Sequence, residues 1–259
     1  MSKISQNYSA DALKFIHITD THLLNRPDET FYNLNTKKNL ESVLSQSKTR
    51  YPDIDFFIFT GDISQTGTKE SYTLFKSLTQ QYDLPIYCVP GNHDTPYLLQ
   101  SIIPSCPDSS INIIQLGNFS LILLNSCVED KHHGLINDLC LRQLENHLQN
   151  NENQFNIIAI HHPPVLINSK WLDDLGLQNQ TEFLHIINKF PHNTLLICGH
   201  VHQEIDHQSN NLRLLATPST CHQFKTNSDY RHHIETPSPA YRYIKITTDK
   251  VETKVHYVK

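Results

Sequence analysis

Residues 84–94 read LPIYCVPGNHD, an apolar run that ends abruptly in a polar cluster. The run LPIYCV carries no charge, as expected of a strand that is buried on both faces. The residues that follow, PGNHD, are poor formers of helix and strand interiors. Asn92, His93 and Asp94 therefore stand side by side at the end of a predicted buried strand. They either decorate a surface turn or line the mouth of an active site.

Other apolar runs along the chain end in the same way. They cover residues 14–22 (KFIHITDTH), 55–62 (DFFIFTGD), 119–126 (FSLILLNS), 155–164 (FNIIAIHHPP) and 194–202 (TLLICGHVH), and two more cover 212–219 and 240–249. Amphipathic spacing predicts helices over 36–50, 69–82, 136–151 and 181–190. Strands that alternate with helices predict an α/β fold, and consecutive strand-like runs in the last third predict antiparallel pairing there. No linker or repeat divides the chain, so residues 1–259 are predicted to form a single domain.

Composition excludes several classes of function. The formal net charge is −5, which gives no basic surface for nucleic acid. The six cysteines form no Cys-x-x-Cys pair and are predicted to be buried, reduced thiols. No signal peptide or membrane span is visible in the sequence, so we expect a cytoplasmic protein with no membrane partner. The 17 histidines favour a metal site, because histidine is the commonest metal ligand.

The polar residues after these strands have the chemistry of metal ligands. Asp20 and His22 are two residues apart, as are His200 and His202, and this spacing predicts that each pair points to one side of its strand. The remaining candidates are Asp62, Asn92 and His161. Open α/β sheets bind ligands at the carboxyl ends of their strands, where all these residues are expected to meet. Seven ligands are too many for one tetrahedral ion but suit two ions that share a carboxylate.

Adjacent histidine pairs supply an internal comparison. His161 and His162 follow an apolar run and precede two prolines. The pairs 132–133 and 232–233 follow no such run, which predicts that they lie in solvated loops. Only the first pair is therefore a candidate for metal binding.

The ordered set DTH, GD, GNHD, HHPP and GHVH, over residues 20–202, resembles the calcineurin-like metallophosphoesterases. Two further stretches, SKWLDDLGLQN (169–179) and LLATPSTCHQFK (214–225), are similar to the corresponding segments of the bacterial class III 3′,5′-cyclic-AMP phosphodiesterases of that superfamily. The resemblance implies a four-layer α-β-β-α sandwich with mixed sheets and a dinuclear metal site at one edge. His222 departs from the family pattern, which has a small apolar residue there.

The resemblance also implies a role for each candidate residue. One ion would be held by Asp20, His22, Asp62 and His202, and the second by Asp62 as a bridge together with Asn92, His161 and His200. His22, Asp62, Asn92, His93 and His202 would also contact the substrate. A hydroxide between the ions would attack phosphorus in cyclic AMP to give 5′-AMP. His93 would protonate the leaving 3′-oxygen, and Asp94 would orient that imidazole.

The mixed ligand set suits Mn²⁺, Fe or Zn²⁺ better than Mg²⁺ or Ca²⁺. A broader phosphodiesterase or phosphomonoesterase could use the same site, as could a non-catalytic scaffold of this fold that had lost its metals. The scaffold is disfavoured because all seven ligands and His93 are present. A nuclease is disfavoured by the acidic charge, and a purple acid phosphatase by the absence of a tyrosine shortly after Asp62.

Overall fold

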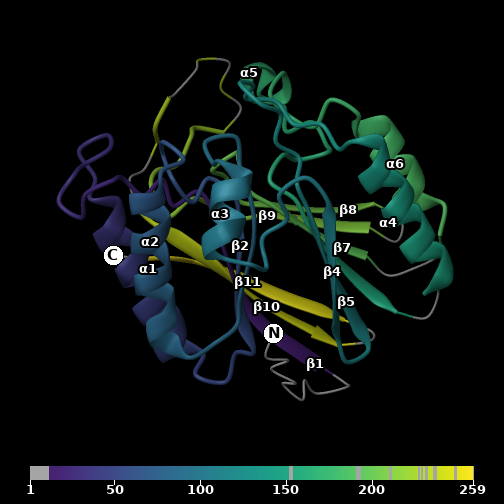
Figure 1. Cartoon of the computed structure of the whole chain (residues 1–259), viewed down its shortest axis with the longest axis horizontal. Helices are drawn as coiled ribbons and strands as arrows, with labels where there is room; N and C mark the ends of the chain where they lie inside the picture. The colour runs from purple at the N-terminus through teal and green to yellow at the C-terminus, as the bar shows by residue number, and fades with distance from the viewer. Residues whose placement is uncertain are drawn as a thin grey trace.

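A computed structural model describes residues 12–151, 154–190, 194–209, 212–226, 228, 230, 233–235, 238–247 and 250–258. The part of the N-terminus before residue 12 and His232 lie outside the described residues. Two mixed sheets stack face to face, with helices on both outer sides (Figure 1). The predicted four-layer α-β-β-α sandwich is therefore confirmed.

The first sheet has the strand order β11-β10-β1-β2-β3. Its strands are β1 (Ala12–Ile18), β2 (Phe56–Thr60), β3 (Ile86–Val89), β10 (Ala240–Thr247) and β11 (Val251–Tyr257). β1, β2 and β3 are parallel, whereas β10 and β11 are antiparallel to their neighbours. The predicted antiparallel pairing near the C-terminus is confirmed.

The second sheet has the order β4-β5-β6-β7-β9-β8. Its strands are β4 (Ile111–Leu116), β5 (Phe119–Leu124), β6 (Phe155–Ala159), β7 (Thr194–Cys198), β8 (Ile205–Ser209) and β9 (Leu212–Ala216). The central strands are parallel, and the edge strands β4 and β8 are antiparallel to β5 and β9. The sequence analysis predicted neither edge strand: β8 lacks an apolar run because its side chains are mostly exposed, and the mostly half-buried β4 was not recognised as a strand.

Helices cover the outer faces of the sheets. α1 (Thr36–Arg50), α2 (Lys69–Thr79) and α3 (Pro96–Ile102) lie on the first sheet, and α4 (Asp138–Asn150), α5 (Lys170–Asp173) and α6 (Gln180–Asn188) accompany the second. The four predicted helices are confirmed, although α2 stops at Thr79 and continues as a single 3₁₀ turn. Asn137 caps α4 by accepting a hydrogen bond from the backbone N–H of Cys140, so the helix begins two residues later than predicted.

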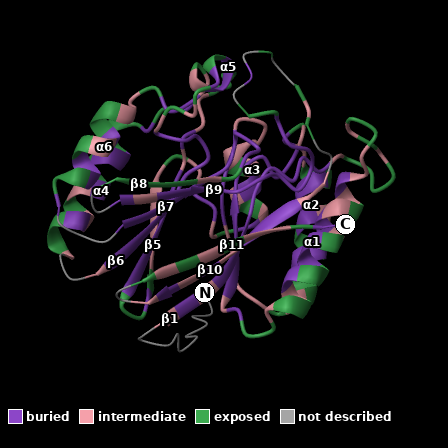
Figure 2. Cartoon of the chain, turned by 180° about the vertical axis from the view of Figure 1, so that it is seen from behind, coloured by how far each residue is buried: buried purple, intermediate pink, exposed green. Residues whose placement is uncertain are grey.

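Three hydrophobic clusters hold these layers together. One lies between the sheets and includes Phe15, Phe56 and Leu121, and the other two lie between each sheet and its helices. The central strands, such as β2, β6 and β7, are buried along their length, whereas β8, β11 and the outer faces of the helices are exposed or half-buried (Figure 2). All six cysteines are free, as predicted, and five are buried, but Cys127 is only partly buried, against the prediction. None of the described helices is both long enough and apolar enough to cross a bilayer.

Candidate metal centre and substrate pocket

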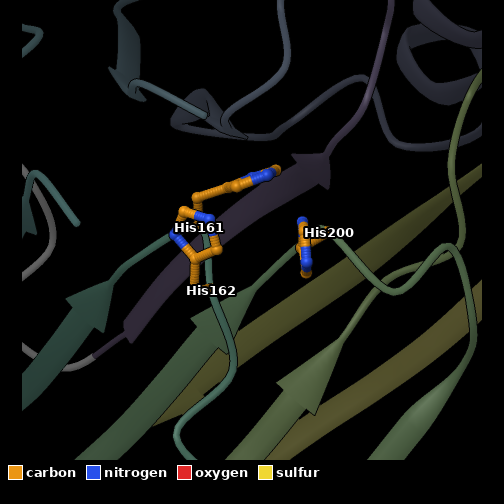
Figure 3. A group of neighbouring side chains, drawn as sticks. All are labelled: His161, His162 and His200. Atoms are coloured by element: carbon orange, nitrogen blue, oxygen red, sulfur yellow. The ribbon is translucent and has the colours of Figure 1, made fainter. Parts of the chain in front are cut away.

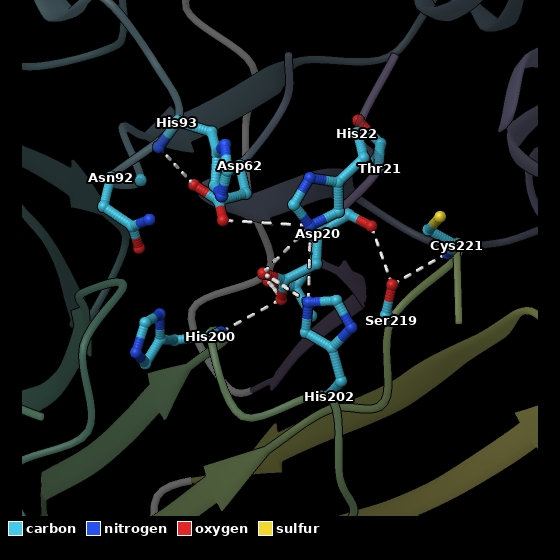
Figure 4. Close-up of polar contacts among 12 residues, drawn as sticks. Asp20, Thr21, His22, Asp62, Asn92, His93, His200, His202, Ser219 and Cys221 are labelled. Atoms are coloured by element: carbon cyan, nitrogen blue, oxygen red, sulfur yellow. Dashed lines mark hydrogen bonds and ion pairs between the residues drawn. The ribbon is translucent and has the colours of Figure 1, made fainter. Parts of the chain in front are cut away.

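The loops after β1 and β2 are joined by backbone hydrogen bonds that bring their polar residues together. The N–H of Asp20 donates to the carbonyl of Gly61 (3.0 Å), and the N–H of His22 donates to that of Asp62 (2.9 Å). The loop after β7 joins them, because the N–H of His200 donates to Asp20 Oδ2 (3.0 Å). The predicted ligands from separate strands thus converge at one edge of the sandwich (Figure 4).

The backbone at these residues differs from the prediction. β1 ends at Ile18 and β7 ends at Cys198, so the two-residue spacing does not act through the pleat of a strand. Five predicted ligands instead adopt the left-handed conformation, with φ of 53° at Asp20, 45° at His22, 48° at Asp62, 70° at His200 and 50° at His202. Left-handed turns, not strand alternation, aim these side chains.

The first cluster contains Asp20, His22 and His202, whose ligand atoms all lie within 4.8 Å of one another. His202 Nε2 is 3.3 Å from Asp20 Oδ1 and 3.3 Å from His22 Nε2. The other ring nitrogen of each imidazole, Nδ1, forms a hydrogen bond on the side away from the centre. His202 Nδ1 donates to the carbonyl of His222 (2.7 Å), and His22 Nδ1 bonds Gln65 Oε1 (2.7 Å). Both imidazoles therefore present Nε2 to the centre, the tautomer that metal binding requires.

The second cluster is centred on His161. Its Nδ1 donates to the carbonyl of Thr60 (2.7 Å), while Nε2 faces Asn92 Oδ1 (3.3 Å) and Asp62 Oδ1 (3.6 Å). Burial lowers the pKa of the His161 imidazole, but the adjacent Asp62 carboxylate raises it more, to about 9. In the absence of a cation, the carboxylates of this site therefore draw a proton onto a histidine.

His200 shows most directly that the cluster is built for a cation. Its Nε2 is buried and has no hydrogen-bond partner within the described chain. Burial lowers the pKa of its imidazole to about 3, so the ring is a neutral donor of an electron pair. A buried imidazole nitrogen left without a partner is costly, and a metal ion would satisfy it. The donor set fits a pair of divalent ions.

His162 lies beside His161 and His200, and the three rings form one group of neighbouring imidazoles (Figure 3). Both of its nitrogens are engaged elsewhere, since Nδ1 bonds Ser126 Oγ (2.8 Å) and Nε2 donates to the carbonyl of His132 (3.1 Å). These bonds leave His161 as the better candidate ligand of the pair.

Asn92 and His93 of the PGNHD turn both face the metal cluster or the pocket. Asn92 faces His161 through its amide oxygen. The N–H of His93 donates to Asp62 Oδ1 (2.9 Å), and its Nδ1 donates to the carbonyl of Gln65 (3.0 Å). His93 Nε2 therefore remains for the pocket, which this residue lines. The PGNHD turn therefore belongs to the site and does not merely decorate the surface.

The prediction that Asp94 orients His93 does not match the structure. The Asp94 carboxylate accepts hydrogen bonds from the backbone N–H groups of Ile63, Ser64 and Gly91 and from the Tyr72 hydroxyl, at 2.9–3.1 Å. Burial, with the charge of Asp62, raises its pKa to about 6. Asp94 ties the PGNHD turn to the loop after β2, and a backbone carbonyl orients the imidazole.

One cavity of about 360 Å³ joins the metal cluster to an aromatic wall. The polar half is lined by the clustered histidines, Asp62 and Asn92, and the other half is apolar and aromatic. The apolar half consists of Phe31, Tyr32, Trp171, Leu172, Leu175, His222 and Phe224. Rings follow one another along this wall: the His222 centroid is 4.9 Å from that of Tyr32 and 5.0 Å from that of Phe224.

Sequence reasoning singled out His222 but missed the other residues of this wall, together with Gln65 and His132. Trp171 and Phe224 lie in the two stretches that carry the resemblance to the cyclic-AMP phosphodiesterases, so a signal for them existed. Phe31 and Tyr32 lie between β1 and α1 with no motif around them. His132 is exposed, as predicted for its pair, yet it contacts Asn92 and lines the cavity.

A buried polar chain stands behind the centre. Arg242, with 1% of its surface exposed, donates to the carbonyls of Ala216 (2.8 Å) and Ile205 (3.1 Å) and to Thr217 Oγ1 (3.3 Å). Thr217 in turn bonds His17. Because Arg242 lies in the first sheet and its carbonyl acceptors belong to the second, the guanidinium links the two sheets near the site.

Solved structures share this architecture. The chain aligns with a dimetal phosphatase from Danio rerio over 94% of this chain and 98% of that one, at 15% identity and a TM-score of 0.67. It also aligns with the protein TT1561 of Thermus thermophilus over 94% and 98% of the two chains, at 12% identity and a TM-score of 0.58. These likenesses and the histidine–aspartate cluster define a protein with the metallo-dependent phosphatase fold.

The family model of the calcineurin-like phosphoesterases matches residues 13–204. The chain belongs to this family of metal-dependent hydrolases. It is 35% identical over 239 residues to the 3′,5′-cyclic adenosine monophosphate phosphodiesterase CpdA of Vibrio vulnificus, covering 92% of this chain and 87% of the relative. It is 33% identical to a 3′,5′-cyclic-nucleotide phosphodiesterase of Nostoc sp., covering 92% and 89%.

Proposed function

We propose that the protein hydrolyses 3′,5′-cyclic AMP to 5′-AMP with the help of two divalent metal ions. One observation carries the proposal: the metal cluster and the aromatic wall line the same cavity. A phosphomonoesterase of small substrates needs only the polar half. An aromatic wall beside the ligands suits a phosphodiester whose ester group carries a planar heteroaromatic base. The names of the relatives in Vibrio vulnificus and Nostoc sp. agree with this substrate class.

The proposed ligand sets follow the two clusters. Asp20, His22 and His202 would hold one ion, and Asn92, His161 and His200 the second, with Asp62 between them. Two divalent ions, when bound, supply Lewis-acid stabilisation of the phosphoryl oxygens and lower the pKa of water held between them. Mn²⁺, Fe and Zn²⁺ suit this mixture of imidazole, carboxylate and amide ligands.

His93 supplies the proton for the leaving group. Its Nδ1–H is committed to the carbonyl of Gln65, so the proton available for transfer is on Nε2. Hydrolysis adds the oxygen of water to phosphorus and breaks the bond between phosphorus and the 3′-oxygen of the ribose. His93 Nε2–H protonates that oxygen, the phosphate stays on the 5′-oxygen, and the ring recovers a proton from solvent.

The aromatic wall would take the base. Tyr32 is 45% exposed and lies at the open end of the ring series, which leaves a face available for stacking. His222, Phe224 and Trp171 are buried, and the ring of His222 contacts that of Tyr32. The ring of His222 also packs against that of His202, with centroids 4.6 Å apart, so position 222 lies between the proposed base subsite and the metal cluster.

Two further expectations stay proposals. We propose that residues 1–259 form one domain and that the enzyme works in the cytoplasm, which the six free cysteines support. The net charge of −5 supports a small-molecule substrate over nucleic acid.

The test is turnover of cyclic AMP by metal-stripped protein to which Mn²⁺, Fe²⁺ or Zn²⁺ is added back, with 5′-AMP as the measured product. We expect metal-dependent formation of 5′-AMP. Hydrolysis of an aryl phosphodiester without hydrolysis of cyclic AMP would keep the metal site and reject the substrate. Failure on both substrates with both metal sites filled would reject the proposed reaction.

A further inference from the structure

The loop between Ser126 and Leu135 is held at several points, although much of it is exposed. The N–H of Leu135 donates to the carbonyl of Ser126 (2.9 Å) and closes the base of the loop. Gly134 is joined to the segment after α5, because its N–H donates to Gly176 (3.1 Å) and its carbonyl accepts from Gln178 (2.8 Å). These bonds fix where the loop lies relative to the pocket.

The buried imidazole of His162 supports this loop from below. Its Nε2 donates to the carbonyl of His132 (3.1 Å), and its Nδ1 bonds Ser126 Oγ (2.8 Å). Gly134 allows the approach, because a Cβ there would lie 2.6 Å from His162 Nδ1. The second histidine of the HHPP motif thus acts on the backbone of residue 132.

The side chain of His132 reaches the metal centre from this support. Its Nδ1 is 3.3 Å from Asn92 Nδ2. An amide nitrogen can only donate, so His132 Nδ1 accepts and the ring carries its proton on Nε2. The opposite end of the same amide, Asn92 Oδ1, faces His161 Nε2 at 3.3 Å. The imidazole therefore determines which end of the amide points to the centre.

We propose that His132 is a positioning residue for the second metal ion, because it holds the amide of Asn92 with Oδ1 turned toward His161. An amide that flips presents Nδ2, a donor that cannot ligate a cation. The proposal rests on the proposed metal role of Asn92. It gives a role to His132, one of the pair of histidines predicted to lie in a solvated loop, and none to His133, which is absent from the cavity lining in the described chain.

The experiment compares stepwise metal binding in four proteins: wild type, His132→Ala, His132→Asn and the control His133→Ala. Apo protein is titrated with Co²⁺, and both dissociation constants are measured by calorimetry together with the visible spectrum of the bound ions. Partners of metal ligands typically contribute about 10–100-fold to affinity. For His132→Ala we expect the second dissociation constant to rise by about 10-fold or more, while the first stays unchanged.

His132→Asn should restore most of the second-ion affinity, because its Oδ1 can accept from Asn92 close to where Nδ1 did. His133→Ala should match wild type. If wild type binds two ions and His132→Ala binds them with the same dissociation constants, this inference is overturned and the proposed function stands. Wild type that binds only one ion would overturn both. Two ions without turnover of cyclic AMP would overturn the proposed substrate alone.

Discussion

Substitution of Gly61 by alanine is expected to damage both the fold and the second metal site. Gly61 has φ of 91°, and an added Cβ would lie 2.7 Å from His161 Cγ and 2.8 Å from the Cα of Gly91. Left-handed backbone costs an alanine about 1–2 kcal/mol, and forcing a methyl group into a packed site costs about 1–3 kcal/mol more. The expected loss of stability is therefore about 2–5 kcal/mol.

A matched variant separates these two contributions. Gly117 has φ of 61° in the exposed turn between β4 and β5, so Gly117→Ala measures the backbone cost at a distance from the site. At about 2–4 °C per kcal/mol, the steric contribution should lower the melting temperature of Gly61→Ala by about 2–12 °C more than that of Gly117→Ala. Thermal unfolding of both proteins in the metal-free state gives this difference directly.

Metal titration completes the comparison. The ring of His161 cannot stay in place against the added methyl group, so Gly61→Ala should weaken the second ion by about 10-fold or more, and Gly117→Ala should leave it unchanged. Equal melting temperatures and equal metal affinities in the two variants would refute the argument, because they would show that Gly61 gives no essential clearance to His161.

Three other substitutions test separate parts of the site. His93→Gln should keep both metal ions but lower kcat on cyclic AMP by about 100-fold or more, as expected for loss of a general acid, and unchanged turnover would remove His93 from catalysis. His222→Val should raise KM for cyclic AMP more than KM for an aryl phosphodiester, because only cyclic AMP has an adenine base for the subsite that the His222 ring helps to form; equal effects on both substrates would place His222 outside the base subsite and point to its packing on His202 instead. Arg242→Met should cost about 3–5 kcal/mol in urea unfolding, since it removes the charged donor that bonds the carbonyls of Ile205 and Ala216. Arg213→Met, which removes a partly exposed pair with Asp206, should cost about 0–1 kcal/mol, and similar losses would contradict the structural role of Arg242.

Much of the fold was predictable from apolar patterning. The buried parallel strands were visible as apolar runs, and α1 and α4 as amphipathic segments. Strand β8 was not predictable, because four of its five side chains are exposed and only the pairing with β9 defines it. The spacing of apolar residues along the sequence indicates which side chains are buried, and an exposed strand has no such spacing.

The metal cluster was predictable for a related reason. Each candidate ligand follows a strand, and parallel strands bring their carboxyl ends to one edge, so position along the chain implied proximity in space. The aromatic wall and His132 had no comparable rule. Tyr32 and His132 reach the cavity on loops whose course depends on long-range hydrogen bonds, such as that from His162 to residue 132.

Hydrogen bonds within the chain hold the backbone of the candidate ligands. Asp20, His22, Asp62, His200 and His202 all adopt left-handed conformations, which cost on the order of 1–3 kcal/mol each for residues other than glycine. Such conformations persist only where surrounding contacts determine them, here the bonds from Asp20 and His22 to the loop after β2 and from His200 to Asp20. The fold thus gives up stability to aim these side chains at one centre. Because contacts within the chain determine this backbone, ion binding would need to order little of it, and more of the interaction energy would be retained as affinity.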